Sequence, residues 1–304
     1  MAEYLTNLKR EIAAVAEAAH ERGQKIKEIY IGGGTPTTLN EAELEDLLKV
    51  LQEQMGSDLV EFTVEAGRPD TLNRRKLEIM HELGVSRISI NPQSMVEETL
   101  RRIGRRHTAA DLEKKYYLAR EVGFNNINMD LIAGLPYEDI KSFRKSFDDV
   151  YSMRPDQLQL GFLKVLKGSH MMEMTGEYQI LYKDREPYEV LSTAWLTYGE
   201  ILRLKMVESM VEVYYNSGQF KHTLVFLEQY FEDPFRMYEA LGRFYEKKGY
   251  SEISHSRMRR YEILMEFAGE QKEIPPEALS DVMLLDLYLR ENLKSRPSFA
   301  SDQK

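Results

Sequence analysis

Three consecutive glycines, Gly32 to Gly34, follow a short apolar run and precede Thr35 and Pro36. Because glycine has no Cβ and tolerates positive φ, the main-chain groups of such a turn can approach a ligand closely. These groups suit a ligand with an amino and a carboxylate group, or one with phosphates. The turn lacks the Gly-Lys-Ser/Thr ending of a P-loop, and Thr37 stands where the pattern GxGxxG needs a glycine. A tight turn without a ligand is the alternative.

Polar side chains that could share this ligand follow other strand-like segments. Glu65, Gln93 and Asp130 each lie at or just beyond the end of an apolar run. Carboxylate and amide groups can accept from, and amides can donate to, vicinal hydroxyls. The alternative is a set of paired charges at a barrel rim, with Arg87 or Arg105 as partners, because buried polar networks are common.

The elements that would position these groups alternate along the first half of the chain. Strand-like runs at 29–31, 59–65, 86–91, 126–132 and 157–162 alternate with helical patterns at 2–22, 41–54, 72–83, 95–103, 109–122 and 140–153. This alternation predicts parallel βαβ units with right-handed crossovers. The carboxyl ends of parallel strands carry the ligand in such folds. We therefore expect the glycine turn and the polar side chains to meet at one edge of a sheet.

The second half of the chain has a helical pattern. An apolar stripe runs from Leu191 to Val211, and further helices are predicted at 220–231, 235–248, 253–267 and 276–293. The frequent aromatic residues here have helical spacing, which indicates a core more than a cofactor surface. The domains expected are a barrel at 1–184, a helical domain at 185–294 and a disordered tail at 295–304.

Composition excludes several classes of function. The formal net charge of the 304 residues is −9, which argues against a general affinity for nucleic acid or an anionic membrane surface. No apolar run reaches the ~20 residues of a transmembrane helix, and the amphipathic N-terminal segment is not a signal peptide, so a cytoplasmic location is predicted. His107 and His170 have no second imidazole at ligand spacing, so no metal site is predicted.

Five motifs follow one another over about 110 residues. They are YIGGGTPT at 30–37, VEAGRP at 64–69, RISINPQS at 87–94, IGRRHT at 103–108 and NMDLIAGLP at 128–136. In this order they resemble the radical S-adenosylmethionine core of oxygen-independent coproporphyrinogen III dehydrogenases, oxidoreductases of heme (porphyrin) biosynthesis. The resemblance implies a partial (β/α) TIM-like barrel that holds S-adenosylmethionine against a [4Fe–4S] cluster. The implied substrate is a small molecule, a porphyrinogen.

The resemblance also implies cofactor-binding roles for single residues and leaves the catalytic residues unknown. The methionyl amino group would contact Gly33, Gly34 and Thr35, and the methionyl carboxylate would pair with Arg105. Glu65 would lie beside the methionyl and ribose portions, Gln93 and Asp130 would bind ribose hydroxyls, and Leu163 would offer backbone and apolar contact to adenine.

The chain departs from this family in one respect. Family members carry the cluster ligands as CxxxCxxC after their first barrel strand, whereas this sequence contains no cysteine. No thiolate can therefore hold an iron–sulfur cluster, and no reductive cleavage of S-adenosylmethionine is expected from this polypeptide alone. We expect a fragment of a radical enzyme that lacks the first strand and the cluster loop.

Residues in the second half resemble a different group within the same superfamily. The segments 154–169, 187–191 and 214–220 are similar to radical S-adenosylmethionine proteins with an N-terminal cobalamin-binding domain and a C-terminal helical domain of unknown function. Two alternatives follow: a cobalamin-dependent radical enzyme of unknown substrate, or a non-catalytic barrel that binds S-adenosylmethionine or a partner protein. The sequence leaves the oligomeric state open.

Overall fold

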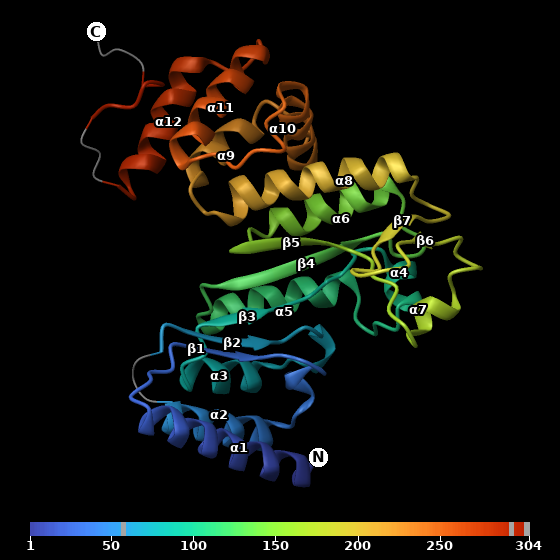
Figure 1. Cartoon of the computed structure of the whole chain (residues 1–304), viewed down its shortest axis with the longest axis vertical. Helices are drawn as coiled ribbons and strands as arrows, with labels where there is room; N and C mark the ends of the chain where they lie inside the picture. The colour runs from blue at the N-terminus through green and yellow to red at the C-terminus, as the bar shows by residue number, and fades with distance from the viewer. Residues whose placement is uncertain (56–58, 292–294, 301–304) are drawn as a thin grey trace. The chain divides into compact units, whose positions relative to one another are not determined.

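We describe the protein from a computed structural model that covers residues 1–55, 59–291 and 295–300 (Figure 1). The chain divides into two compact units. The first contains Met1–Ile132 and Met153–Gln157, and the second contains Ala133–Ser152 and Leu158–Lys304. The predicted domain boundary between residues 184 and 185 lies inside the second unit, so it stays a prediction.

The first half of the chain has the predicted alternation of strands and helices. The strands are β1 Glu28–Ile31, β2 Glu61–Glu65, β3 Arg87–Ser89 and β4 Ile127–Ala133, followed by β5 Gln157–Phe162. The helices are α1 Ala2–Glu21, α2 Glu41–Met55, α3 Arg74–Glu82, α4 Glu97–Arg102, α5 Ala109–Val122 and α6 Ile140–Ser152, with short 3₁₀ turns at Pro36–Thr38 and Pro69–Thr71. The strands form one sheet in the order β1-β2-β3-β4-β5, which confirms the predicted α/β class.

The two faces of this sheet differ in character. The register is parallel: Tyr30 pairs with Thr63, Thr63 with Arg87, and Ser89 with Asn128. Side chains alternate along a strand, so paired residues share a face. One face is apolar and at most 2% exposed, with Phe62, Val64, Ile88, Ile127 and Met129. The other face is polar and consists of Tyr30, Glu61, Thr63, Glu65, Arg87, Ser89, Asn128 and Asp130.

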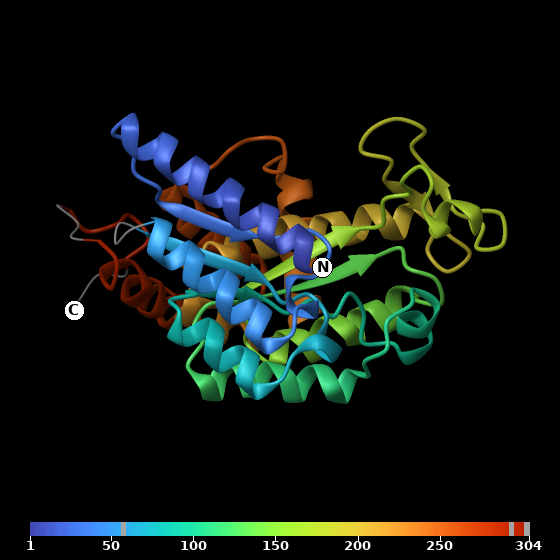
Figure 2. The same ribbon diagram turned by 90° about the horizontal axis from the view of Figure 1, so that it is seen from below.

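A row of helices flanks the sheet of the first unit (Figures 1 and 2). In this row α1 packs on α2, α2 on α3, and α3 on α5. Each helix contributes residues to the core, such as Leu44, Leu77 and Leu112, which are fully buried. The apolar face of the sheet therefore belongs to the hydrophobic core, and the polar face is the one available for a ligand.

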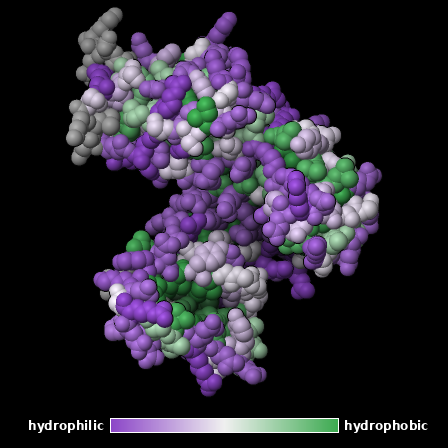
Figure 3. Space-filling model, in the orientation of Figure 1, coloured by the Kyte–Doolittle hydropathy of each residue, from purple (hydrophilic) through white to green (hydrophobic). Residues whose placement is uncertain are grey.

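Strand β1 stands at the edge of the sheet, where it pairs with β2. Its Tyr30 is 63% exposed, and the nearby Val60 is 75% exposed. A space-filling view shows an apolar area on the first unit, in a surface that is otherwise mostly hydrophilic (Figure 3). An edge strand with exposed apolar side chains can pair with another chain.

The second unit consists mostly of helices. After α6 and β5 come α7 His170–Glu173, β6 Leu181–Tyr182, β7 Val190–Ser192, α8 Tyr198–Met210, a π-helical turn at Val211–Asn216, α9 Lys221–Glu228, α10 Pro234–Lys248, α11 Arg257–Glu270 and α12 Pro276–Tyr288. The aromatic residues of this unit mostly form its core, as their spacing indicated. Phe147 of α6 packs against Tyr151 and against Phe235 of α10, each with ring centroids 5.6 Å apart.

Two segments of the second unit differ from the sequence-based expectation. Residues 190–192 form a strand that pairs with β6, although the apolar stripe predicted a helix from Leu191. That helix begins at Tyr198, because Thr197 and Glu200 form a capping box that fixes its first turn. The predicted tail, residues 295–304, contacts α11 as far as it is described, since the Phe299 ring stacks on Tyr261 at 5.4 Å. Residues 301–304 lie outside the described part.

Among the helices in the described ranges, none combines the length and apolarity needed to cross a bilayer.

The amino end of α9 depends on a carboxylate from a distant helix. Phe220 provides no side-chain cap, and the buried Asp286 of α12 accepts instead from the Thr223 amide at 2.8 Å and the His222 amide at 3.0 Å. The Thr223 hydroxyl donates to the same carboxylate at 2.7 Å. Asp286 thus satisfies donors that would otherwise be buried without partners.

We predict that Asp286→Ala lowers the free energy of unfolding by about 2 to 4 kcal/mol, because it removes a cap and leaves buried donors unpaired. Urea unfolding followed by circular dichroism measures this loss. The matched control is Asp281→Ala on the exposed side of α12, which should change stability by less than about 0.5 kcal/mol. Equal effects of the two substitutions would contradict the capping role.

Candidate functional site

The glycine turn after β1 presents its main chain to open space. Gly33 has a φ of +96°, and a Cβ built on Gly33 or on Gly34 would meet no atom within 4 Å. Thr35 has a φ of 73°, which is unusual for a β-branched residue, and its amide donates to the Gly33 carbonyl at 2.9 Å. Strained backbone of this kind clusters at ligand sites. The turn therefore has the accessible backbone that the sequence predicted.

Glu65 lies beside this turn at the carboxyl end of β2. Its carboxylate accepts a hydrogen bond from the Tyr30 hydroxyl of β1. The Tyr30 side chain is largely exposed, but partial desolvation, and then this hydrogen bond and the charge of Glu65, raise the pKa of Tyr30 to about 12. A Cβ on Gly32 would lie 2.5 Å from the Tyr30 ring and 3.4 Å from the Glu65 carboxyl carbon. Gly32 is thus required for the close approach of the turn to this pair, and Tyr30 is a site residue that the sequence analysis missed.

Arg105 and Gln93 form a second fixed pair at the same edge. The Arg105 Nε donates to Gln93 Oε1 at 3.0 Å, and its Nη1 donates to the Gly67 carbonyl at 2.9 Å. Gln93 has a φ of 63°, and its backbone N–H donates to the backbone carbonyl of Asp130 at 3.1 Å. Burial, and then the charge of Arg68, lower the pKa of Arg105 from its usual value. The guanidinium is thus oriented by two protein acceptors.

Asp130 has an unsatisfied acceptor. It lies on the polar face of β4, and its Oδ1 is buried without a hydrogen-bond partner among the described residues. Burial raises the pKa of Asp130 to about 6, although the charge of Arg105 opposes the shift. Buried polar atoms are nearly always paired, so an orphaned carboxylate oxygen indicates a donor that is missing from the protein itself.

Arg87, one of the two arginines predicted to pair with Glu65 or Asp130, belongs instead to a polar network elsewhere on this face. The Arg87 guanidinium donates to Asn128 at 3.2 Å and to Gln157 at 2.6 Å, and it pairs with Glu61 at 3.4 Å. Its partners therefore sit toward the amino ends of the strands. The described contacts of Arg87 include neither Glu65 nor Asp130, so the network leaves the carboxyl edge to a ligand.

Leu163 belongs to the second unit, whereas the other predicted site residues belong to the first. Its side chain is buried, its amide donates to the Ala133 carbonyl at 2.9 Å, and its carbonyl accepts from the Val190 amide at 2.9 Å. Both main-chain groups are occupied, which leaves only the side chain for a ligand. The predicted contact with adenine stays a prediction.

Known families match both halves of the chain. Residues 5–150 match the radical SAM superfamily, and residues 176–304 match a family described as a protein of unknown function, DUF4080. The second match agrees with the predicted resemblance to a helical domain of unknown function.

Individual relatives match the first half. The oxygen-independent coproporphyrinogen-III oxidase-like protein HemZ of Bacillus subtilis is 39% identical over 179 residues, which cover 58% of this chain and 36% of HemZ. The heme chaperone HemW of the same organism is 35% identical over 153 residues, 50% of this chain and 40% of HemW. Among solved structures, coproporphyrinogen III oxidase (HemN) from Escherichia coli aligns with a TM-score of 0.50 and 31% identity, over 54% of this chain and 37% of that one. The chain thus spans well under half the length of these relatives.

We predict that the stability cost of the Asp130 charge depends on pH. The pKa of Asp130 is about 6 in the folded protein and 3.8 without the protein environment, so the folded state holds this proton more tightly. The contribution of the protonated Asp130 carboxyl to the free energy of unfolding is therefore fully present below the unfolded pKa of 3.8. This contribution is lost as the pH rises through 6. The free energy of unfolding of Asp130→Asn, measured relative to that of the wild type, should therefore rise by about 1 to 1.5 kcal/mol as the pH increases from 5 to 8.

Urea unfolding of both proteins at the two pH values tests this prediction. Asp281→Asn, at an exposed position on α12, is the matched control and should show no such dependence. A difference between Asp130→Asn and the wild type that stays constant with pH would mean that the Asp130 carboxylate is not held in an unfavourable environment.

Proposed function

We propose that residues 5–150, which match the radical SAM superfamily, bind S-adenosylmethionine at the carboxyl edge of their sheet. The observation that carries the proposal is the buried carboxylate oxygen of Asp130, which lacks a donor. The vicinal hydroxyls of a ribose are donors of the right kind, and a charge-assisted hydrogen bond to a buried carboxylate is strong. Asp130 is the fourth of the seven residues of β4, and it lies beyond the level at which β2 ends at Glu65 and β3 ends at Ser89. Parallel folds bind ligands at this edge.

The surrounding groups suit the rest of this ligand. We assign the ribose hydroxyls to Asp130 and Gln93, and the methionyl carboxylate to Arg105, whose guanidinium is already oriented and has further N–H groups to donate. The methionyl amino group is a donor, and the exposed main chain of Gly33 and Gly34 supplies carbonyl acceptors. The Thr35 carbonyl already accepts from the Thr38 amide at 3.0 Å and from the Thr38 hydroxyl at 2.8 Å, so its predicted contact stays a prediction. Glu65 lies next to this turn and adds negative charge beside the sulfonium and amino cations.

The residues of this chain do not fit a [4Fe–4S] cluster. The sequence has no cysteine, and the described residues contain no group of three histidine or acidic side chains that could hold a metal ion. Since an iron–sulfur cluster is held by thiolates, we derive no radical step for this polypeptide. Its proposed role is to bind and orient S-adenosylmethionine.

For the activity in which this domain takes part, we propose chemistry on a porphyrinogen. Support comes from the names of HemZ and HemN, which are coproporphyrinogen oxidase or oxidase-like proteins. A second candidate is the binding of a tetrapyrrole without chemistry, which the similarity to the heme chaperone HemW favours. An absorbance titration with hemin tests the second candidate: a shifted Soret band that saturates at one equivalent supports it, and the absence of a shift argues against it.

Titration calorimetry with S-adenosylmethionine tests the site. We predict a Kd on the order of 0.1 to 1 mM at pH 7.5, or about 4 to 5.5 kcal/mol of binding free energy. Because the ionised carboxylate accepts from the ribose, affinity should fall about tenfold at pH 5, one unit below the Asp130 pKa of about 6.

The substitution Asp130→Ala should abolish this binding, whereas the exposed control Asp46→Ala should leave the Kd unchanged. A folded wild-type chain that releases no heat with the ligand, or an Asp130→Ala variant that binds as well as the wild type, would contradict the proposed site.

A further inference from the structure

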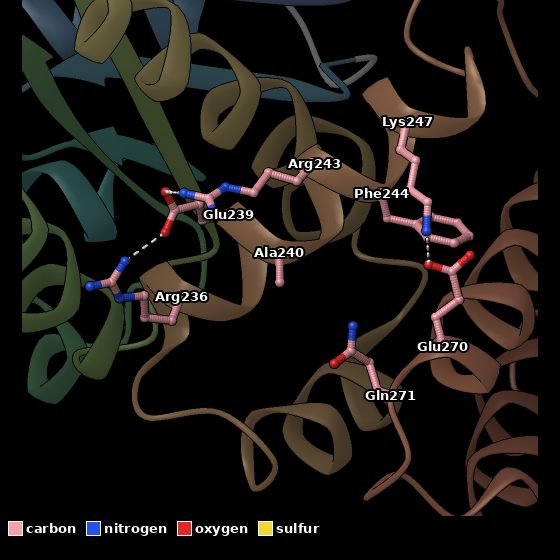
Figure 4. A pocket seen from close by; sticks show the side chains of 8 residues that line it. All are labelled: Arg236, Glu239, Ala240, Arg243, Phe244, Lys247, Glu270 and Gln271. Atoms are coloured by element: carbon pink, nitrogen blue, oxygen red, sulfur yellow. Dashed lines mark hydrogen bonds and ion pairs between the residues drawn. The ribbon is translucent and has the colours of Figure 1, made fainter.

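A cavity of about 390 Å³ lies in the second unit between α10 and the end of α11 (Figure 4). Its volume falls within the range of small-molecule sites. It is lined by Arg236, Glu239, Ala240, Arg243, Phe244, Lys247, Glu270 and Gln271. A smaller cavity of about 210 Å³ shares Gln271 with it. The site proposed above uses none of these residues.

One wall of the cavity gathers arginines around a single carboxylate. Glu239 of α10 has a side chain that is 4% exposed, and it accepts from Arg236 at 2.9 Å and from Arg243 at 2.9 Å. Arg203 of α8 also pairs with Glu239. Burial acts to raise the pKa of Glu239, but its hydrogen bonds to these arginines hold the pKa below the usual value. Glu239 is therefore ionised and fixes the guanidinium groups in place.

The opposite wall is built from lysines and a second carboxylate. Glu270 of α11 pairs with Lys247 at 2.8 Å and with Lys248 at 2.9 Å. Figure 4 shows the two charged groups on either side of Ala240, with Gln271 facing the space between them. The small side chain of Ala240 leaves this space open.

The charges around the cavity do not cancel. Of the residues that line it, Arg236, Arg243 and Lys247 are cationic and Glu239 and Glu270 are carboxylates, a surplus of one positive charge in a chain whose formal net charge is −9. The exposed Glu232 lies outside this lining, 3.9 Å from Arg236, and it also pairs with Arg144. The Arg243 and Lys247 side chains are 61% and 66% exposed, so their donors can reach a ligand.

We propose that this cavity binds the phosphate group of a small phosphorylated molecule. A phosphate monoester is an anion at neutral pH, and its charge suits the positive surplus of the lining. Arginine donors bind phosphate oxygens in pairs, and lysine binds them as a point charge. Arg236 and Arg243 are held by Glu239 before a ligand arrives, so little side-chain entropy is lost on binding.

Titration calorimetry with inorganic phosphate and with ribose 5-phosphate tests the proposal at low ionic strength. Both should bind at one site, and the ester should bind more tightly because the cavity has room for its sugar. Arg243→Gln and Lys247→Gln should each weaken binding about five- to tenfold. Both side chains are mostly exposed, so these variants should keep the wild-type circular dichroism spectrum.

Lys221→Gln is the matched control, because Lys221 is an exposed cation on α9 of the same unit. It should leave the affinity within twofold of the wild type. The proposal is overturned if phosphate shows no saturable binding, if Lys221→Gln weakens it as much as Arg243→Gln does, or if ribose 5-phosphate binds no more tightly than inorganic phosphate.

Discussion

The parallel register of β2, β3 and β4 decides where chemistry can occur in the first unit. With this register, alternate residues of neighbouring strands share a face, and one face is buried as apolar core. The other face must then accommodate all the polar side chains. Arg87 satisfies those near the amino ends of the strands, through Glu61, Asn128 and Gln157. The carboxyl edge receives the rest, and there the Oδ1 of Asp130 has no donor within the described part of the chain.

That unpaired oxygen has an energetic consequence. A buried carboxylate is unstable as an ion, and the pKa of about 6 for Asp130 expresses this cost. The fold tolerates the cost because the core of strands and helices around it is well packed. A ligand with hydroxyl groups in this place would recover part of the lost hydrogen bonding. A destabilised group at a strand end is thus more readily explained by binding than by stability.

The sequence predicted the strands and their order along the chain. It also predicted that Gly33, Glu65, Gln93 and Asp130 lie toward the carboxyl edge of the sheet. These follow from periodicity and from the geometry of parallel sheets. The pairings could not be predicted, because they join residues far apart in the chain: Arg105 to Gly67, and Tyr30 to Glu65. The alternation of polar residues along β2 and β3 was a signal for the Arg87 network.

In the second unit, too, the sequence did not reveal very short strands or contacts between distant residues. The hairpin β6–β7 was missed because two and three residues are too few to show a strand pattern beside an apolar stripe. The cap that Asp286 provides for α9 depends on a residue more than 60 positions away. The surplus of cations around Glu239 likewise appears only when α8, α10 and α11 are brought together. Local sequence patterns predict helices and strands, whereas sites depend on contacts between residues that lie far apart in the sequence.

The most direct test of the central claim is a crystal structure of this chain with S-adenosylmethionine bound. We predict density for the ribose within hydrogen-bond distance of the Asp130 carboxylate, with the methionyl group between Arg105 and the turn at Gly33 to Thr35. Density for the ligand at another place, with Asp130 Oδ1 still unpaired, would contradict the claim that this carboxylate is the centre of the site.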